Sequence, residues 1–255
     1  MCPACLSALA VTVLTGTGAG AAATAFVVGA ARVLKRSVMS MKSAEIVREV
    51  NPIDEERIHG VTFDGKLVWF ARDDELVAYD PETSTVVKRL SVPGARAGTA
   101  FDGENLYQLA GGEIVVVRPS DGVVVRRMPA PGKSEDGTST ARDCSGMAYA
   151  DGYLFVGVGR AAKILKIDAG TGALVKTLSS DRFVTGVSCV GGALWHGVST
   201  DGKTPELRRL GPEGAVEEAV VVPVEHIAGV EGTGDGTFWC AGERGKLRLV
   251  RAGAV

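Results

Sequence analysis

A short apolar phrase built around one glycine recurs five times between residues 57 and 255, and this repeat limits the fold more than any other feature of the chain. An aromatic residue follows each glycine after nine or ten positions. Successive glycines are between 38 residues (60 to 98) and 48 residues (98 to 146) apart, which matches the length of a β-propeller blade. The glycines are Gly60, Gly98, Gly146, Gly186 and Gly229, and the aromatic residues are Trp69, Tyr107, Phe155, Trp195 and Trp239.

Each repeat has the pattern of a four-stranded blade. In the first, a short inner strand over 61–63 is followed by the turn Asp64-Gly65, a second strand over 66–71 and a third over 75–79. Asp-Gly between apolar residues is a strong hairpin pattern, because both positions adopt positive φ at little cost. A fourth strand over 85–92 leads to the next repeat, so the fold class is all-β.

The last repeat lacks its outer strand. After Gly229 only three strands follow, the third over 246–250, and the chain then stops. The segment 44–50 has the alternation of a strand and precedes the first complete blade. Pairing it with 246–250 would close the ring and remove an exposed sheet edge. We therefore predict a five-bladed propeller over residues 43–255, preceded by an N-terminal segment over residues 1–42.

This N-terminal segment differs in composition from the rest of the chain. Residues 1–31 carry no charge, and the run from Leu6 to Val28 is long enough to cross a bilayer as a helix, so we expect a membrane anchor. The positive charges follow the run, which is unlike a secretory signal peptide and places the propeller in the cytoplasm by the positive-inside rule. Translation from Met39 or Met41 would remove the segment altogether.

The bulk charge and the cysteines exclude several classes of partner. The net charge is −2 and the lysines and arginines are dispersed, so we expect no nucleic-acid binding. No motif for a cofactor or a resident metal is present, and none is expected. Cys2 and Cys5 form a Cys-x-x-Cys pair without the βαβ or second-pair context of a redox or zinc site, which favours membrane-proximal or lipid-modified thiols.

Ionisable side chains cluster just before each innermost strand, where the blades of a propeller converge on the axis. We predict an acid–base centre from His59, Asp143 and Glu225, because general acid–base catalysis needs titratable groups within hydrogen-bond reach of a ligand. Two alternatives remain: salt bridges that hold blades in register, and a zinc site made of His59, Cys144, His226 and Asp143. The predicted ligand-binding residues are Arg57, Arg96, Arg142, Arg182 and His226; Glu56 and Asp181 belong to the same clusters.

The aromatic residue in every blade is a candidate stacking platform, but its presence in all five repeats favours packing between blades. His196 follows Trp195 and should point to the opposite side of its strand, as a hydrogen-bonding residue between blades.

Several blades resemble the glutamine cyclotransferases, the plant and bacterial five-bladed glutaminyl-peptide cyclases. The stretches 96–100 and 106–109 (R-A-G-T-A and L-Y-Q-L) resemble that family's G-E-G-L-T and L-Y-Q-L, and 58–61, 184–188 with 194–195, and 228–231 with 238–242 resemble its first, fourth and fifth blades. The resemblance implies a five-bladed fold, a location outside the cytoplasm, and cyclisation of an N-terminal glutamine. The family's proton-moving glutamate corresponds to Ala97, which cannot transfer a proton.

Two functions follow from these observations. The first is a cyclotransferase-like propeller that binds a peptide or small polar ligand at the axis and transfers an acyl group to form pyroglutamate, with other residues replacing the glutamate. The second is a non-catalytic, membrane-tethered propeller that binds a peptide or protein partner. Fold alone does not distinguish them.

Overall fold

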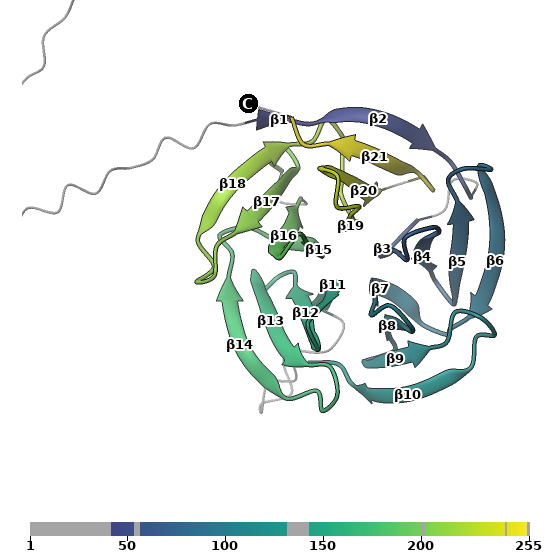
Figure 1. Ribbon diagram of the computed structural model, residues 1–255. Helices are drawn as coiled ribbons and strands as arrows, with labels where there is room; N and C mark the ends of the chain where they lie inside the picture. Colours follow the sequence, from purple (N-terminus) through teal and green to yellow (C-terminus); the bar gives the residue numbers. More distant parts are fainter. Residues whose placement is uncertain (1–41, 54–56, 132–142, 200–201, 243, 254–255) are drawn as a thin grey trace, which may run out of the picture. The chain divides into compact units, whose positions relative to one another are not determined.

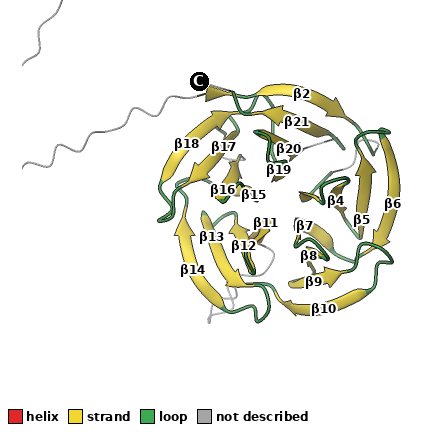
Figure 2. Ribbon diagram, in the orientation of Figure 1, coloured by secondary structure: helices red, strands yellow, loops and turns green. Residues whose placement is uncertain are grey.

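The chain forms a ring of five β-sheets. The structure is a computed structural model that describes residues 42–53, 57–131, 143–199, 202–242 and 244–253. Over these residues the regular elements are all strands, and the sheets surround one axis (Figure 1, Figure 2). The predicted all-β, five-bladed propeller is therefore confirmed.

Each blade contains four adjacent antiparallel strands, with the first at the axis and the fourth towards the rim (Figure 1). Blade 1 contains β3 (Val61–Phe63), β4 (Val68–Arg72), β5 (Glu75–Asp80) and β6 (Thr85–Ser91). Blade 2 contains β7 (Ala95–Phe101), β8 (Leu106–Ala110), β9 (Glu113–Val117) and β10 (Val124–Pro129). Blade 3 contains β11 (Cys144–Ala150), β12 (Tyr153–Val158), β13 (Lys163–Asp168) and β14 (Leu174–Ser179). Blade 4 contains β15 (Val184–Val190), β16 (Ala193–Val198), β17 (Glu206–Leu210) and β18 (Val216–Val221). Blade 5 contains β19 (Gly229–Gly232), β20 (Thr237–Ala241), β21 (Leu247–Arg251) and β2 (Glu45–Val50).

The two ends of the propeller close the ring, as the sequence predicts. Strand β2 pairs antiparallel with β21, with Val50 opposite Leu247. One contact was not predicted: β1 (Lys42–Ser43) pairs in parallel with β18, so blade 4 has a fifth strand. The segment from 42 to 50 therefore bridges two blades before the first complete blade begins.

The five anchor glycines form a closed ring of backbone contacts around the axis. A Cβ built on Gly60 would lie 2.4 Å from the Ala97 carbonyl oxygen, and one built on Gly186 would lie 2.5 Å from the Val230 nitrogen. Gly98, Gly146 and Gly229 press against the backbone of the following blade in the same way. None of the five has a positive φ. Each position therefore requires glycine for close approach of two backbones rather than for an unusual conformation.

The aromatic residues pack between blades, as their repetition indicates. Trp69, Trp195 and Trp239 are all at least 92 % buried, and the ring of Trp195 lies 4.9 Å from that of Phe238 in the following blade. Trp239 likewise belongs to a buried cluster with Phe70 of blade 1. The core is thus divided into layers between neighbouring sheets.

A second inter-blade contact repeats at the rim. In four blades, the outer-strand residue that lies in register with the aromatic residue is a lysine or an arginine. Its side chain donates hydrogen bonds to the turn between the third and fourth strands of the next blade. Lys88 reaches the carbonyl oxygens of Pro119 and Ser120 at 3.0 and 2.9 Å. The equivalent bonds run from Arg48 to Pro81 and Ser84, from Arg126 to Ala169 and Gly170, and from Lys176 to Pro212 and Glu213.

Blade 4 reverses the charge of this contact. Its residue in the same row is Glu218, and the next blade has no turn at this place because the ring closes there. Glu218 instead accepts a hydrogen bond from Lys42 of β1 at 2.9 Å. The outer-strand residue is therefore acidic in the one blade that meets the closing segment.

The predicted membrane anchor from Leu6 to Val28 lies outside the described residues, as does most of the predicted segment 1–42. Within the part of the chain that the structure describes, there is no helix of the length and apolarity needed to span a membrane.

The glycine ring gives a direct stability test. Gly186→Ala places a methyl group 2.5 Å from the Val230 nitrogen, and backbone cannot move aside as a flexible side chain can. We expect a loss of about 3 kcal/mol or more in the free energy of unfolding, measured by urea titration. Gly170→Ala is the matched control, because its nearest contact is the Asp168 side chain at 3.3 Å, and it should change stability by less than about 0.5 kcal/mol. Equal effects would contradict the close-approach explanation.

Candidate functional site

The predicted site residues lie at one end of the ring. The start of β3 pairs with the end of β4, and the end of β4 pairs with the start of β5. The loops before the innermost strands therefore lie at the same end as the loops between second and third strands. We call this the leading end and the opposite end, which carries the tight turns, the trailing end.

His59 and Arg96, both predicted from the sequence, meet on a carboxylate that the sequence analysis missed. Asp73 lies 3.5 Å from Nε2 of His59 and 3.2 Å from Nε of Arg96. Burial lowers the pKa of His59, and Asp73 partly offsets this effect. Asp73 has a φ of 44°, an uncommon conformation for a residue other than glycine. An open depression of about 500 Å³ is lined by Asp73 and its neighbours in the β4–β5 loop.

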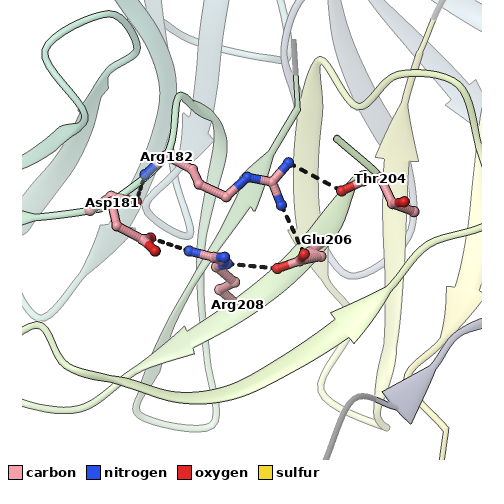
Figure 3. Close-up of polar contacts among 6 residues, drawn as sticks. Asp181, Arg182, Thr204, Glu206 and Arg208 are labelled. Carbon is pink, nitrogen blue, oxygen red and sulfur yellow. Dashed lines mark hydrogen bonds and ion pairs between the residues drawn. The ribbon is translucent and has the colours of Figure 1, made fainter. Parts of the chain in front are cut away.

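Arg182, predicted to bind a ligand, takes part in an ion-pair network within blade 4 (Figure 3). It donates to Glu206 at 2.8 Å and to the Thr204 carbonyl oxygen at 3.1 Å. Arg208 binds both Glu206 and Asp181. Glu206 thus joins two nearly buried guanidinium groups, which ties the loop before β15 to strand β17. The alternative of structural salt bridges holds here, although these bridges lie within one blade rather than between blades.

Glu225 and His226 line a cavity of about 260 Å³ on blade 5, together with three cations from the β20–β21 loop and β21. We call this the blade 5 pocket; its charged residues are Glu225, His226, Arg244, Lys246 and Arg248. Lys246 and Arg248 both bind Glu49, each at 2.6 Å, and the bond from Lys246 contributes most to lowering the pKa of that carboxyl. Nδ1 of His226 lies 2.9 Å from the Ser199 hydroxyl.

The remaining predicted residues have separate surroundings. Asp143 precedes β11, and its carbonyl oxygen accepts a hydrogen bond from Gly159. The Cys144 thiol donates to the Pro131 carbonyl oxygen at 3.3 Å, and burial raises its pKa to about 11. Arg57 lies near enough to His59 to lower the pKa of that histidine. Arg142 and Glu56 lie outside the described residues.

No hydrogen bond or ion pair between described residues joins His59, Asp143 and Glu225. In the same described ranges, no three histidine, cysteine, aspartate or glutamate side chains are grouped closely enough to hold a metal ion, so they form no zinc site of the kind considered from the sequence. Asp73, Arg244, Lys246 and Arg248 were missed because they belong to the second and third strands and their loops. Alternating strand direction alone places those loops at the leading end.

His196 is fully buried in β16, opposite Val187 and Arg208 in the neighbouring strands. Its two ring nitrogens have no hydrogen-bond partner among the described residues, so the expected inter-blade hydrogen bond is absent there. Burial, and secondarily the charge of Arg208, lowers its pKa to about 4.

Comparison with solved structures identifies the fold. The Myxococcus xanthus glutaminyl cyclase aligns with a TM-score of 0.68 and 18% sequence identity, over 83% of this chain and 97% of that one. The chain has a glutaminyl cyclase-like propeller fold. A protein of unknown function from Bacteroides caccae aligns with a TM-score of 0.52 and 12% identity, over 72% of this chain and 69% of that one. No family model and no curated protein matches the sequence.

In this glutaminyl cyclase-like propeller, Ala97 directly precedes Gly98, the anchor glycine of blade 2. His59 directly precedes Gly60, the anchor glycine of blade 1. The Ala97 carbonyl oxygen accepts a hydrogen bond from Nε2 of Gln108 at 3.1 Å, and Gly60 packs against the same oxygen. His59, two residues before β3, and Ala97, in β7, therefore lie in neighbouring blades at the leading end.

Buried His196 predicts an acid-sensitive fold. Its pKa is about 4 in the folded protein and about 6.5 when unfolded, so between these values the unfolded chain binds more protons. The stability contribution is complete above about pH 6.5 and falls by up to about 3 kcal/mol as the pH decreases towards 4. Blade 3 carries Val156 at the equivalent position, so His196→Val suits the fold and should remove this dependence in urea titrations. His59→Ala is the control, since that histidine is less buried; if it removed as much of the slope, the assignment to His196 would be wrong.

Proposed function

We propose that this propeller binds a small ligand or peptide end that carries a carboxylate, in the blade 5 pocket, without forming pyroglutamate. The observation that carries the proposal is the charge of the pocket. Three cationic side chains face two carboxylates, Glu225 and Glu49, and the Arg244 guanidinium has no partner among the described residues. A guanidinium suits a carboxylate because both groups are planar and form paired hydrogen bonds.

The backbone of Arg244 and Gly245 is held in place before a ligand arrives. Arg244 has a φ of 58°, and such a conformation persists in a residue other than glycine only where its surroundings hold it. The carboxamide of Asn51 lies against the carbonyl oxygens of Arg244 and Gly245, at 2.9 and 3.0 Å, and it can donate to both when its amide nitrogen is turned towards them. Backbone held in this way loses little conformational entropy on binding.

Ala97 is the reason to propose binding without acyl transfer. The position that resembles a proton-moving glutamate carries a methyl group, and no hydrogen bond or ion pair joins His59, Asp143 and Glu225 among the described residues. In this proposal the apolar N-terminal segment tethers the propeller to a membrane, and the ligand is a peptide, a small molecule or the end of a protein partner.

Calorimetry with trialanine and with its C-terminal amide tests the proposal, since the two differ only in the carboxylate. We expect the acid to bind at least about tenfold more tightly, which is about 1.4 kcal/mol, and Arg244→Gln to remove the difference. Arg118→Gln, at a trailing-end turn and paired with Asp121, is the control and should bind like the wild type. Equal binding of acid and amide would refute the proposal.

A second function, pyroglutamate formation, is favoured by one observation. His59 directly precedes Gly60, which packs against the Ala97 carbonyl oxygen, and burial keeps the His59 imidazole neutral near pH 7 by lowering its pKa. A neutral imidazole can accept the proton that the N-terminal amine loses as it attacks the glutamine side-chain carbonyl. It can then return this proton to the nitrogen that departs as ammonia.

Mass spectrometry of a peptide with an N-terminal glutamine tests this function. If His59 replaces the glutamate, the wild type should release one ammonia per peptide, and His59→Ala should lower the rate by about 100-fold or more. Ala97→Glu should raise the rate in either background. A folded wild-type protein that leaves the peptide unchanged would exclude cyclisation.

A further inference from the structure

A polar cluster lies on the trailing side of the glycine ring. The second residue after each anchor glycine occupies an equivalent position, and the five are Thr62, Ala100, Ala148, Ser188 and Glu231. Glu231 of blade 5 contacts the hydroxyl of Thr62 in blade 1 and that of Ser188 in blade 4. Three oxygen-bearing side chains from three blades therefore meet at the axis.

The spacing of these oxygens is wide for direct hydrogen bonds. The Thr62 hydroxyl lies 3.4 Å from Oε2 of Glu231, and the Ser188 hydroxyl lies 3.4 Å from Oε1. A hydroxyl that donates to a carboxylate usually approaches to about 2.5–2.7 Å. Adjacent oxygens that bind one cation at about 2.4 Å lie about 3.4 Å apart when the bonds are perpendicular, and 2.4 Å is the usual calcium–oxygen distance.

The geometry points to a cation site in which Glu231, Thr62 and Ser188 hold a hard, oxygen-preferring ion, with Ca²⁺ as the best fit. Carboxylate and hydroxyl oxygens are the ligand type of such ions, and Mg²⁺, with bonds of about 2.0–2.1 Å, would need them closer together. Ala100 and Ala148 supply no ligand, so water completes the coordination. With one carboxylate we expect a Kd of about 0.1–1 mM, as in weak calcium modules.

The surroundings hold the ligands but leave a path for the ion. The Gly232 N–H donates to the Ser188 hydroxyl at 2.9 Å and fixes its orientation. Glu231 is only partly buried by its neighbours, so solvent reaches it. The polar cluster lies on the trailing side, whereas the blade 5 pocket lies at the leading end. This inference is therefore independent of the proposed function.

Three tryptophans make the site visible. Trp69, Trp195 and Trp239 are the cross-strand partners of Thr62, Ser188 and Glu231. Excitation of these indoles should sensitise the luminescence of Tb³⁺, a calcium substitute, bound to the full chain near pH 7, and Ca²⁺ should compete it away. CaCl₂ at about ten times the Kd should raise Tm by about 3 °C or more.

Glu231→Gln is the decisive variant, because it keeps the shape and removes the charge. It should lose both the terbium signal and the calcium shift, and Thr62→Val should weaken both. Glu104→Gln, an exposed trailing-end glutamate, is the control and should retain both. Terbium luminescence or a calcium shift that survives in Glu231→Gln would overturn the proposal, as would an absence of both in the wild type. A larger shift with Mg²⁺ than with Ca²⁺ would overturn the choice of ion.

Discussion

Backbone contact between innermost strands at five glycines is the constraint on which this propeller depends. Each of these strands lies so close to the next that a methyl group would meet main-chain atoms within 3 Å. The contact runs from blade to blade and returns from Gly229 to Val61, so all five sheets are fixed around the axis together.

At the rim, hydrogen bonds rather than close packing join each blade to the next. The same sheet row that buries an aromatic residue between blades ends in a cation that binds the next blade's turn. Where the turn is missing, Glu218 binds Lys42 of the segment that closes the ring. These partly exposed bonds are individually weak, but they join neighbouring sheets at four places and the closing segment at the fifth.

The polar groups near the axis differ between blades, whereas the packing residues are alike. At the leading end, Asp73 pairs with His59 and Arg96, Glu206 pairs with Arg182, and Arg244 lines the blade 5 pocket with Lys246 and Arg248. At the trailing end, one glutamate faces two hydroxyls. A repeated scaffold with unlike residues at equivalent positions can thus build an asymmetric site without changing the fold.

The sequence by itself determined the blade count, the closing strand and the aromatic core, because each of these depends on the repeated pattern of glycines, aromatic residues and strands along the chain. It also identified most charged residues of the leading end. Tertiary structure decided which of them meet. Thr62 and Glu231 are 169 residues apart, and Asp73 and Arg244 come from strands and loops that the repeat does not mark as axial. Such contacts depend on the depth and rotation of each side chain around the axis, and a period along the chain carries no information about either.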